Sequence, residues 1–169
     1  EKVRALRYDL DASGDKAYFP LDRMVEAVFD CANRLFGLSF EARPEIRAYH
    51  PDVKVYEVRG RDGAQIGVFL HDNFARPSKR SGAWMSNYRQ QSRNTAGGSA
   101  VTPIVVNNNN FAKGAPGEPT LLSFDDARTL FHECGHGLHG LLSSVTYERL
   151  SGTNVLRDFV ELPSQLFEH

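Results

Sequence analysis

Two histidines and a glutamate in the last third of the sequence have the types and the spacing of a metal site. His132 and His136 are four residues apart. In an α-helix, residues with this spacing project from one face, so both imidazoles can bind one ion. Glu133 points to the space beside that ion, where it can take a proton from a water molecule made acidic by zinc and pass it to a leaving amine. This HExxH motif therefore predicts a zinc site with a general base.

A catalytic zinc site of this type needs a carboxylate as its third protein ligand, with the fourth position left for water. Four acidic residues that follow the histidines could supply it, namely Glu148, Asp158, Glu161 and Glu168. Glu148 lies in an expected loop, Asp158 begins an expected helix, and Glu161 lies well placed within that helix. Spacing alone leaves the choice among the four open.

Two other residues, Cys134 within the motif and His139 just after it, are expected to stay outside the metal shell. His139 lies on the metal-facing side, but it is about 10 Å along the helix axis from His132, so we interpret it as a polar neighbour. Cys134 is a soft zinc ligand in principle, yet two positions beyond His132 it points to the opposite face, which favours a packed thiol. Gly135 leaves room for another backbone to approach.

The histidine ligands also need partners, because a ligating histidine usually donates its second N–H to a carboxylate or a carbonyl. Asp158 and Gln165 lie one turn on either side of Glu161, and either could serve. The alternative for Asp158 is an ion pair with Arg157 or a role in capping the helix.

The helices that must position these groups are visible in the sequence. Ser123–Asp126 matches a capping box and begins a long helix through Leu142. Leu156–His169 predicts a second helix despite Pro163, whose missing N–H costs little in the first turn or two. Apolar spacing predicts a further helix over residues 21–38, with Gly37 as its stop.

Strands are expected before the metal motif. Val53–Arg59 alternates, and Ile66–Leu70 resumes β-like character after a turn that contains an Asp-Gly pair, so the two predict a β-hairpin. Pro103–Val106 predicts another short strand, running into Asn107–Asn110. The four asparagines are equally compatible with a low-complexity loop.

These elements predict an α+β fold, with helices forming most of the mass and a small antiparallel sheet beside the metal helix, built from residues 53–70 and 104–110. We expect residues 1–169 to be part of one catalytic domain, with a sheet region at 50–112 and zinc helices at 123–143 and 156–169.

Composition excludes several other classes of function. Twenty basic and twenty-one acidic residues leave a net charge of −1, so no overall field favours nucleic acid or an anionic membrane. The two cysteines make a poor disulfide framework and fit a reducing compartment. No membrane span or signal peptide is visible. We therefore expect a cytoplasmic protein without nucleic-acid or membrane partners.

A resemblance to a known family rests on three motifs, Phe131–Gly140, Leu150–Thr153 and Arg157–His169. In the right order and separation, they closely resemble the thimet oligopeptidase family of zinc metallopeptidases, and the likeness extends over residues 20–169. Within that family, three further segments look most like the bacterial peptidyl-dipeptidases: Arg76–Trp84, Pro103–Phe111 and Leu122–Asp126.

The resemblance implies that His132, His136 and Glu161 bind one zinc ion, with Glu133 as general base and acid. It also implies a zincin-like core that hydrolyses short peptides in a narrow cleft and releases dipeptides from the C-terminal end. An endo-acting oligopeptidase of the same family and a noncatalytic zinc-binding module are the alternatives. Cys134 departs from the family, which usually has Phe there; the change removes packing but no catalytic atom.

Members of this family are several times longer and mostly helical, and they contribute His and Tyr residues from beyond the zinc helices. The sequence has no initiator Met and stops directly after an expected helix, so we expect it to be cut from a longer peptidase whose remainder completes the cleft. On its own the chain is expected to cleave peptides poorly.

Two features could bind substrate. No acidic residue occurs from Asn73 to Gly117, and Arg80 or Arg93 in this segment could bind the terminal carboxylate of a peptide. The alternative is that both arginines are solvated or pair with acids elsewhere. Val105–Phe111 is the candidate strand for pairing with an extended peptide, or else an interior strand leading to the metal helix.

Overall fold

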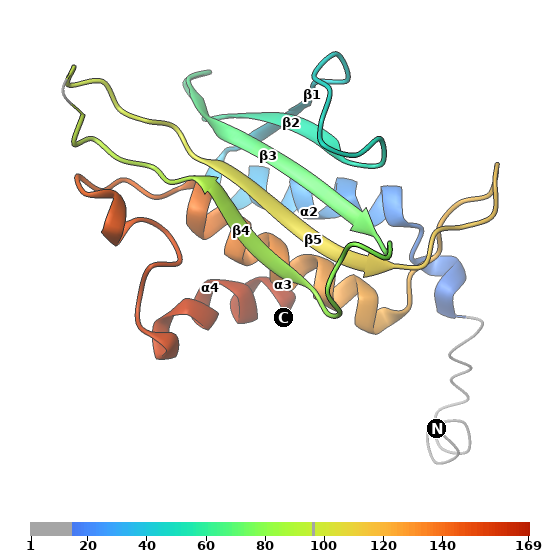
Figure 1. Ribbon diagram of the computed structural model, residues 1–169. Helices are drawn as coiled ribbons and strands as arrows, with labels where there is room; N and C mark the ends of the chain where they lie inside the picture. The colour runs from blue at the N-terminus through green and yellow to red at the C-terminus, as the bar shows by residue number, and fades with distance from the viewer. Residues whose placement is uncertain (1–14, 96) are drawn as a thin grey trace.

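The computed structural model describes residues 15–95 and 97–169, which form a mixed α/β fold (Figure 1). The α-helices are α2 (Leu21–Phe36), α3 (Phe124–Leu141) and α4 (Arg157–Glu168). The strands are β1 (Ser39–Ala42), β2 (Lys54–Arg59), β3 (Gln65–Phe74), β4 (Trp84–Arg89) and β5 (Ile104–Phe111). Two short 3-10 helices complete the described elements, η1 (Asp15–Tyr18) and η2 (Glu148–Leu150). The expectation that helices form most of the mass is wrong for this chain, since the described helices cover fewer than half of its residues and a five-stranded sheet lies beside them.

All five strands belong to one sheet, in the order β1-β2-β3-β5-β4. The predicted hairpin is confirmed, because β2 and β3 pair antiparallel around a turn in which Gly63 has a φ of 77°. The expectation of a purely antiparallel sheet is wrong, since β3 and β5 run parallel, with Val68 opposite Ile104. The chain reverses once between β3 and β4 and again between β4 and β5, and two reversals leave β5 in the direction of β3.

The helices α2 and α3 lie across one face of the sheet, and α4 packs against α3 (Figure 1). Their apolar faces meet those of β2, β3 and β5 in one core, whose fully buried members include Val28, Val58, Phe69, Val105 and Leu130. Because α3 contacts β5, β4 and β3 as well as α4, its polar face is held between the outer strand and the last helix.

The predicted helix limits are largely confirmed. The residue Gly37 stops α2 in the left-handed conformation, with a φ of 71°. At the start of α3, the Asp126 N–H donates to Ser123 Oγ over 3.1 Å, and the Ser123 N–H donates to Asp126 Oδ2 over 3.0 Å. This capping box satisfies two backbone donors that a helix leaves unpaired. None of the described helices is long and apolar enough to span a membrane.

The four asparagines belong to β5, so the alternative of a low-complexity loop is wrong. Asn107, Asn108 and Asn109 are buried. The side-chain N–H of Asn109 donates to Asn73 Oδ1 over 2.9 Å, and β3 and β4 pair with the backbone of β5 on its two sides. Because β5 is interior, the expectation that Val105–Phe111 pairs with an extended peptide is wrong, and the alternative of an interior strand is confirmed.

The outer strand next to β5 is β4, which the sequence did not predict. The apolar residues Trp84 and Met85 are adjacent in it, so it lacks the alternation that marks a half-buried strand. β1, at the other edge, was also missed. β4 matters most because it borders the face of α3 that carries the histidines.

Candidate metal centre

The side chains of His132, His136 and Glu161 converge between α3 and α4. One Oε atom of Glu161 lies 3.3 Å from His132 Nε2 and 3.2 Å from His136 Nε2. One donor atom from each residue lies within 4.8 Å of the other two, so the group could hold a metal ion. Two ligands about 2 Å from a tetrahedral zinc lie about 3.3 Å apart. The donor set and its spacing therefore fit zinc.

Close contact between the two helices brings Glu161 to the histidines. A Cβ atom built on Gly135 would lie 2.6 Å from Ser164 Cα and 2.7 Å from the carbonyl oxygen of Pro163. Such distances exclude a side chain at position 135, as expected for a glycine that admits a second backbone. The same turn of α4 contains Pro163, which cannot donate a helical hydrogen bond to Phe159.

Glu133 lies beside this group with its side chain largely buried. The residue is 6% exposed, and its Oε2 atom has no hydrogen-bond partner in the described part of the chain. Burial raises the pKa of the Glu133 carboxyl to about 7, and the negative charge of Glu161 adds to this, while His132 opposes it. A buried, unpaired carboxylate that can exchange a proton near neutral pH is suited to general-base chemistry.

The Nδ1 atom of His132 contacts the carboxylate of Glu168, which the sequence offered only as a possible metal ligand. Glu168 Oε2 lies 2.6 Å from His132 Nδ1, and Arg128 donates to Glu168 Oε1 over 2.7 Å. Burial alone would raise the pKa of the Glu168 carboxyl, but hydrogen bonds from His132 and Arg128 lower it below its ordinary value. Glu168 lies two helical turns beyond Glu161, and this seven-residue spacing could have indicated a shared face.

The two predicted partners of the histidines lie elsewhere. Asp158 and Gln165 are both exposed on α4, and neither is hydrogen-bonded to His132 or His136 among residues 15–95 and 97–169. The structure therefore does not bring them to the metal group. His136 Nδ1 is buried without a partner in the same set of residues.

Cys134 and His139, which the sequence placed outside the metal shell, lie apart from the converging donors. Cys134 is buried in the core, where burial raises the pKa of its thiol. His139 is not among the converging donors; its ring lies 6.1 Å from that of Phe159, and burial lowers its pKa.

The two arginines proposed for a substrate carboxylate lie outside the cavities around the metal group. Arg80 is exposed and stacks over Trp84, with its guanidinium carbon 4.5 Å from the ring centre. Arg93 donates to the Ser144 carbonyl over 2.9 Å. The cation that does line a cavity beside His132 is Arg128, which sequence reasoning missed.

Two adjoining cavities of about 350 and 370 Å³ flank the converging donors and share Ala83, His132 and Glu133. One extends along β4 and α4 and is lined by Trp84, Met85, Thr153 and Val160. The other extends towards the start of α3 and is lined by Asp125, Arg128, Thr129 and Glu168. Together they form a trough over the metal group, apolar towards β4 and charged at its other end.

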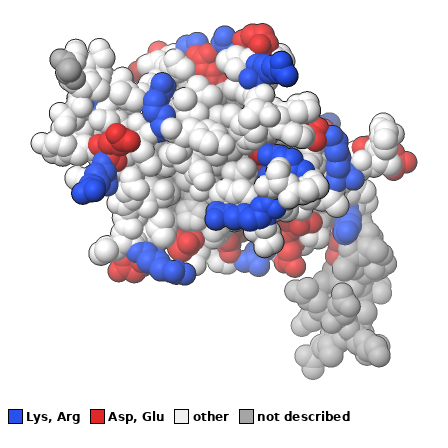
Figure 2. Space-filling model, viewed as in Figure 1, with Lys and Arg blue, Asp and Glu red and all other residues white. Residues whose placement is uncertain are grey.

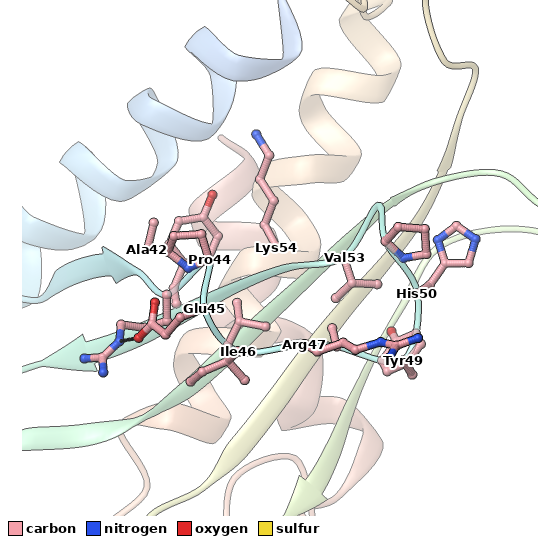
Figure 3. A pocket seen from close by; sticks show the side chains of 14 residues that line it. Ala42, Pro44, Glu45, Ile46, Arg47, Tyr49, His50, Val53 and Lys54 are labelled. Carbon is pink, nitrogen blue, oxygen red and sulfur yellow. Dashed lines mark hydrogen bonds and ion pairs between the residues drawn. The ribbon is translucent and has the colours of Figure 1, made fainter.

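A larger cavity, about 740 Å³, lies elsewhere (Figure 3). It is formed by the loop that arches from β1 to β2, between Ala42 and Tyr56, and shares no residue with the metal group. Its Arg43 is already paired with Glu45 and Glu57. The donors that could hold a metal ion converge at the trough and lie outside this cavity.

Charged side chains elsewhere on the surface are mostly balanced. Figure 2 shows basic and acidic side chains next to one another at several places on the face that it presents. Three cations of the acid-free segment pair with acids outside it: Arg76 and Lys79 with Asp72, and Lys113 with Asp52.

A known protein family matches the whole length of the chain. The sequence profile of Peptidase family M3 matches residues 1–169. The chain is 48% identical over 170 residues to the dipeptidyl carboxypeptidase of Escherichia coli strain K12, covering 100% of the chain and 24% of that protein.

Two further relatives are more distant. Oligopeptidase A of Escherichia coli strain K12 is 36% identical over 170 residues, covering 100% of the chain and 25% of that protein. The thimet-like oligopeptidase of Dictyostelium discoideum is 37% identical over 167 residues, covering 95% of the chain and 24% of that protein. The chain therefore spans about a quarter of the length of these relatives.

Proposed function

The chain belongs to peptidase family M3, and on that basis we propose that it is the zinc-binding part of a longer metallopeptidase that hydrolyses short peptides. In this proposal residues 1–169 are part of one catalytic domain, with a zincin-like arrangement of the sheet region 50–112 and the helices at 123–143 and 156–169. The observation that carries the proposal is the convergence of His132, His136 and Glu161 beside the buried carboxylate of Glu133.

The proposed roles follow from the positions of these side chains. His132, His136 and Glu161 would hold one zinc ion, which when bound supplies Lewis acidity to a water molecule and to the peptide carbonyl. Glu133 takes a proton from the attacking water and returns it to the leaving amine. Its raised pKa favours this exchange near neutral pH, because the same group must accept and then release the proton.

The substrate would lie in the trough between α3 and β4. β4 is the last strand of the sheet, so the outer edge of its backbone suits pairing with an extended peptide. This strand takes the place that the sequence assigned to Val105–Phe111. Arg80 and Arg93 remain the proposed contacts for a terminal carboxylate, and Arg80 has the stronger support since it stacks on Trp84, which lines the trough.

We predict that Glu161→Ala removes zinc from the chain. Loss of a direct ligand should weaken zinc binding by more than the roughly 10–100-fold that loss of an outer partner costs. The measurement is zinc content after dialysis, together with affinity from competition with a chelator. Glu148→Ala is the matched control, since Glu148 is an exposed carboxylate outside the converging group. Equal zinc content in wild type and Glu161→Ala would remove Glu161 from the site.

We further predict release of dipeptides from the C-terminal end, as the name of the dipeptidyl carboxypeptidase relative suggests. The test uses the full-length natural protein and one peptide with either a free or an amidated C-terminus. Amidation should lower kcat/KM at least tenfold, because it removes the charge that a cation would bind. Undiminished cleavage of the amidated peptide would instead indicate an endo-acting oligopeptidase, which the similarity to oligopeptidase A favours.

The 169-residue chain alone is expected to cleave either peptide poorly.

A further inference from the structure

The two histidines of the metal group are held differently at the ring nitrogen that faces away from Glu161. His132 Nδ1 lies 2.6 Å from Glu168 Oε2. His136 Nδ1 is buried and has no partner within the described residues. A histidine binds a metal through a nitrogen that carries no proton, and the hydrogen bond at the other nitrogen selects that tautomer. In the described part of the chain, His132 is therefore the histidine of the metal group whose Nδ1 is bonded to a carboxylate, whereas Glu161 faces Nε2 of both.

Glu168 is itself fixed from the other side. Its Oε1 atom accepts a hydrogen bond of 2.7 Å from Arg128, which precedes His132 by one turn of α3. The Glu168 side chain is 16% exposed and that of Arg128 is 42% exposed, so the ion pair is partly buried. A carboxylate held between a cation and an imidazole has little freedom to turn, because each of its oxygens has a separate partner.

The contacts form two bridges between the same two helices. Glu161 reaches the Nε2 atoms of both histidines from one turn of α4. Two turns later, Glu168 reaches back to Nδ1 of His132 and to Arg128. The close approach at Gly135 fixes the spacing of α3 and α4 between these bridges.

We propose that Glu168, held in place by Arg128, is a positioning residue that keeps the proton of His132 on Nδ1 and turns Nε2 towards the metal. This inference rests on the proposed function, because it gives a role to a side chain behind one of the proposed ligands. If the pair served only to join α3 to α4, its loss would change stability and leave zinc affinity and the tautomer unaltered.

The test combines a measurement on the metal-free chain with one on the zinc-bound chain. In the metal-free chain, the nitrogen chemical shifts of His132 should report a proton on Nδ1 in the wild type and a mixture of tautomers in Glu168→Gln. Zinc affinity, from chelator competition, should fall about 10–100-fold in Glu168→Gln. Arg128→Met should shift both quantities in the same direction by a smaller amount, because Glu168 remains but is less fixed.

Asp30→Asn is the matched control, since it removes an ion pair with Arg34 on α2 that touches no residue of the metal group. It should leave both quantities unchanged. Unaltered zinc affinity in a folded Glu168→Gln chain, or a proton on Nε2 of His132 in the wild type, would overturn the inference. If the wild-type chain binds no zinc, the proposed function fails, and the tautomer of His132 alone decides whether Glu168 positions it.

Discussion

Replacing Glu133 with Gln should lower kcat for peptide hydrolysis about 10²–10⁴-fold, the usual contribution of a general acid–base group. Gln has nearly the same size as Glu but cannot take a proton from water. Glu133 is 6% exposed and has no hydrogen-bond partner for Oε2 among the described residues, so the substitution breaks no visible contact. The fold and the metal group should survive while the chemical step fails.

The measurement is kcat and zinc content of the full-length natural protein and its Glu133→Gln variant, with Glu148→Gln as a control for the loss of one carboxylate. Zinc content should be equal in all three, because Glu133 is not among the converging donors. If Glu133→Gln kept full activity, Glu133 would not be the base. If the full-length protein bound zinc but showed no peptidase activity that depends on Glu133, a noncatalytic zinc-binding module would be the better description.

Asp72→Ala should destabilise the folded chain by about 3–5 kcal/mol, the usual cost of removing one partner from a buried ion pair. Asp72 is fully buried, and its carboxylate accepts two hydrogen bonds of 2.7 Å from Arg76 and one of 2.8 Å from Tyr49. Lys79, whose side chain is 3% exposed, lies 3.0 Å from the same carboxylate. Removal of Asp72 leaves two cations without their anion in the interior.

The measurement is the free energy of unfolding in urea, with Asp30→Ala as the control for an exposed ion pair, which should cost about 1 kcal/mol or less. For a chain of this size the melting temperature should fall by roughly 6–20 °C. A loss below about 1 kcal/mol would show that the buried network contributes no more than a surface pair.

The contacts of Asp72 with Arg76, Lys79 and Tyr49 also predict that the stability of the fold depends on pH. Burial alone would raise the pKa of the Asp72 carboxyl, but hydrogen bonds from Arg76, Lys79 and Tyr49 bring it below its ordinary value. A carboxyl with a lowered pKa stabilises the fold above its unfolded pKa of about 3.9, and this contribution is lost as the pH falls through the folded pKa. The difference between wild type and Asp72→Ala should therefore shrink below about pH 4.

Lys79, one of the partners of Asp72, also helps to position the trough over the metal group. Beyond its contact with Asp72, the Lys79 ammonium donates to the carbonyls of Asp72, Phe74 and Asn109. It thereby ties the loop after β3 to the ends of β3 and β5. That loop leads directly to Ala83 and Trp84, which line the trough, so Lys79, a cation of the acid-free segment, has a structural role.

Much of the proposed site was predictable from short stretches of sequence. The spacing of His132 and His136, with Glu133 between them, specifies one helix face whatever surrounds it. The capping box at Ser123 and the αL stop at Gly37 act within a single turn, and both were predicted and found. Such features depend on neighbours a few residues away, and the sequence contains all of them.

Other features depend on residues far apart in the chain, and those were missed or wrong. The burial of Asn107 follows from the position of β5 between β3 and β4 and from the close approach of Gly137, none of which a polar run reveals. The parallel pairing of β3 and β5 depends on the outer placement of β4, a strand without alternation in its own sequence.

The features of the metal group divide in the same way into local ones, which the sequence predicted, and long-range ones, which it did not. The sequence by itself determined the histidine pair and the adjacent Glu133, because helical geometry fixes their relation within one turn. The tertiary structure decided that Glu168, and neither Asp158 nor Gln165, contacts the back of His132. Which carboxylate on α4 reaches that nitrogen depends on how closely the two helices approach, and the contact of Gly135 with Pro163 and Ser164 sets that distance.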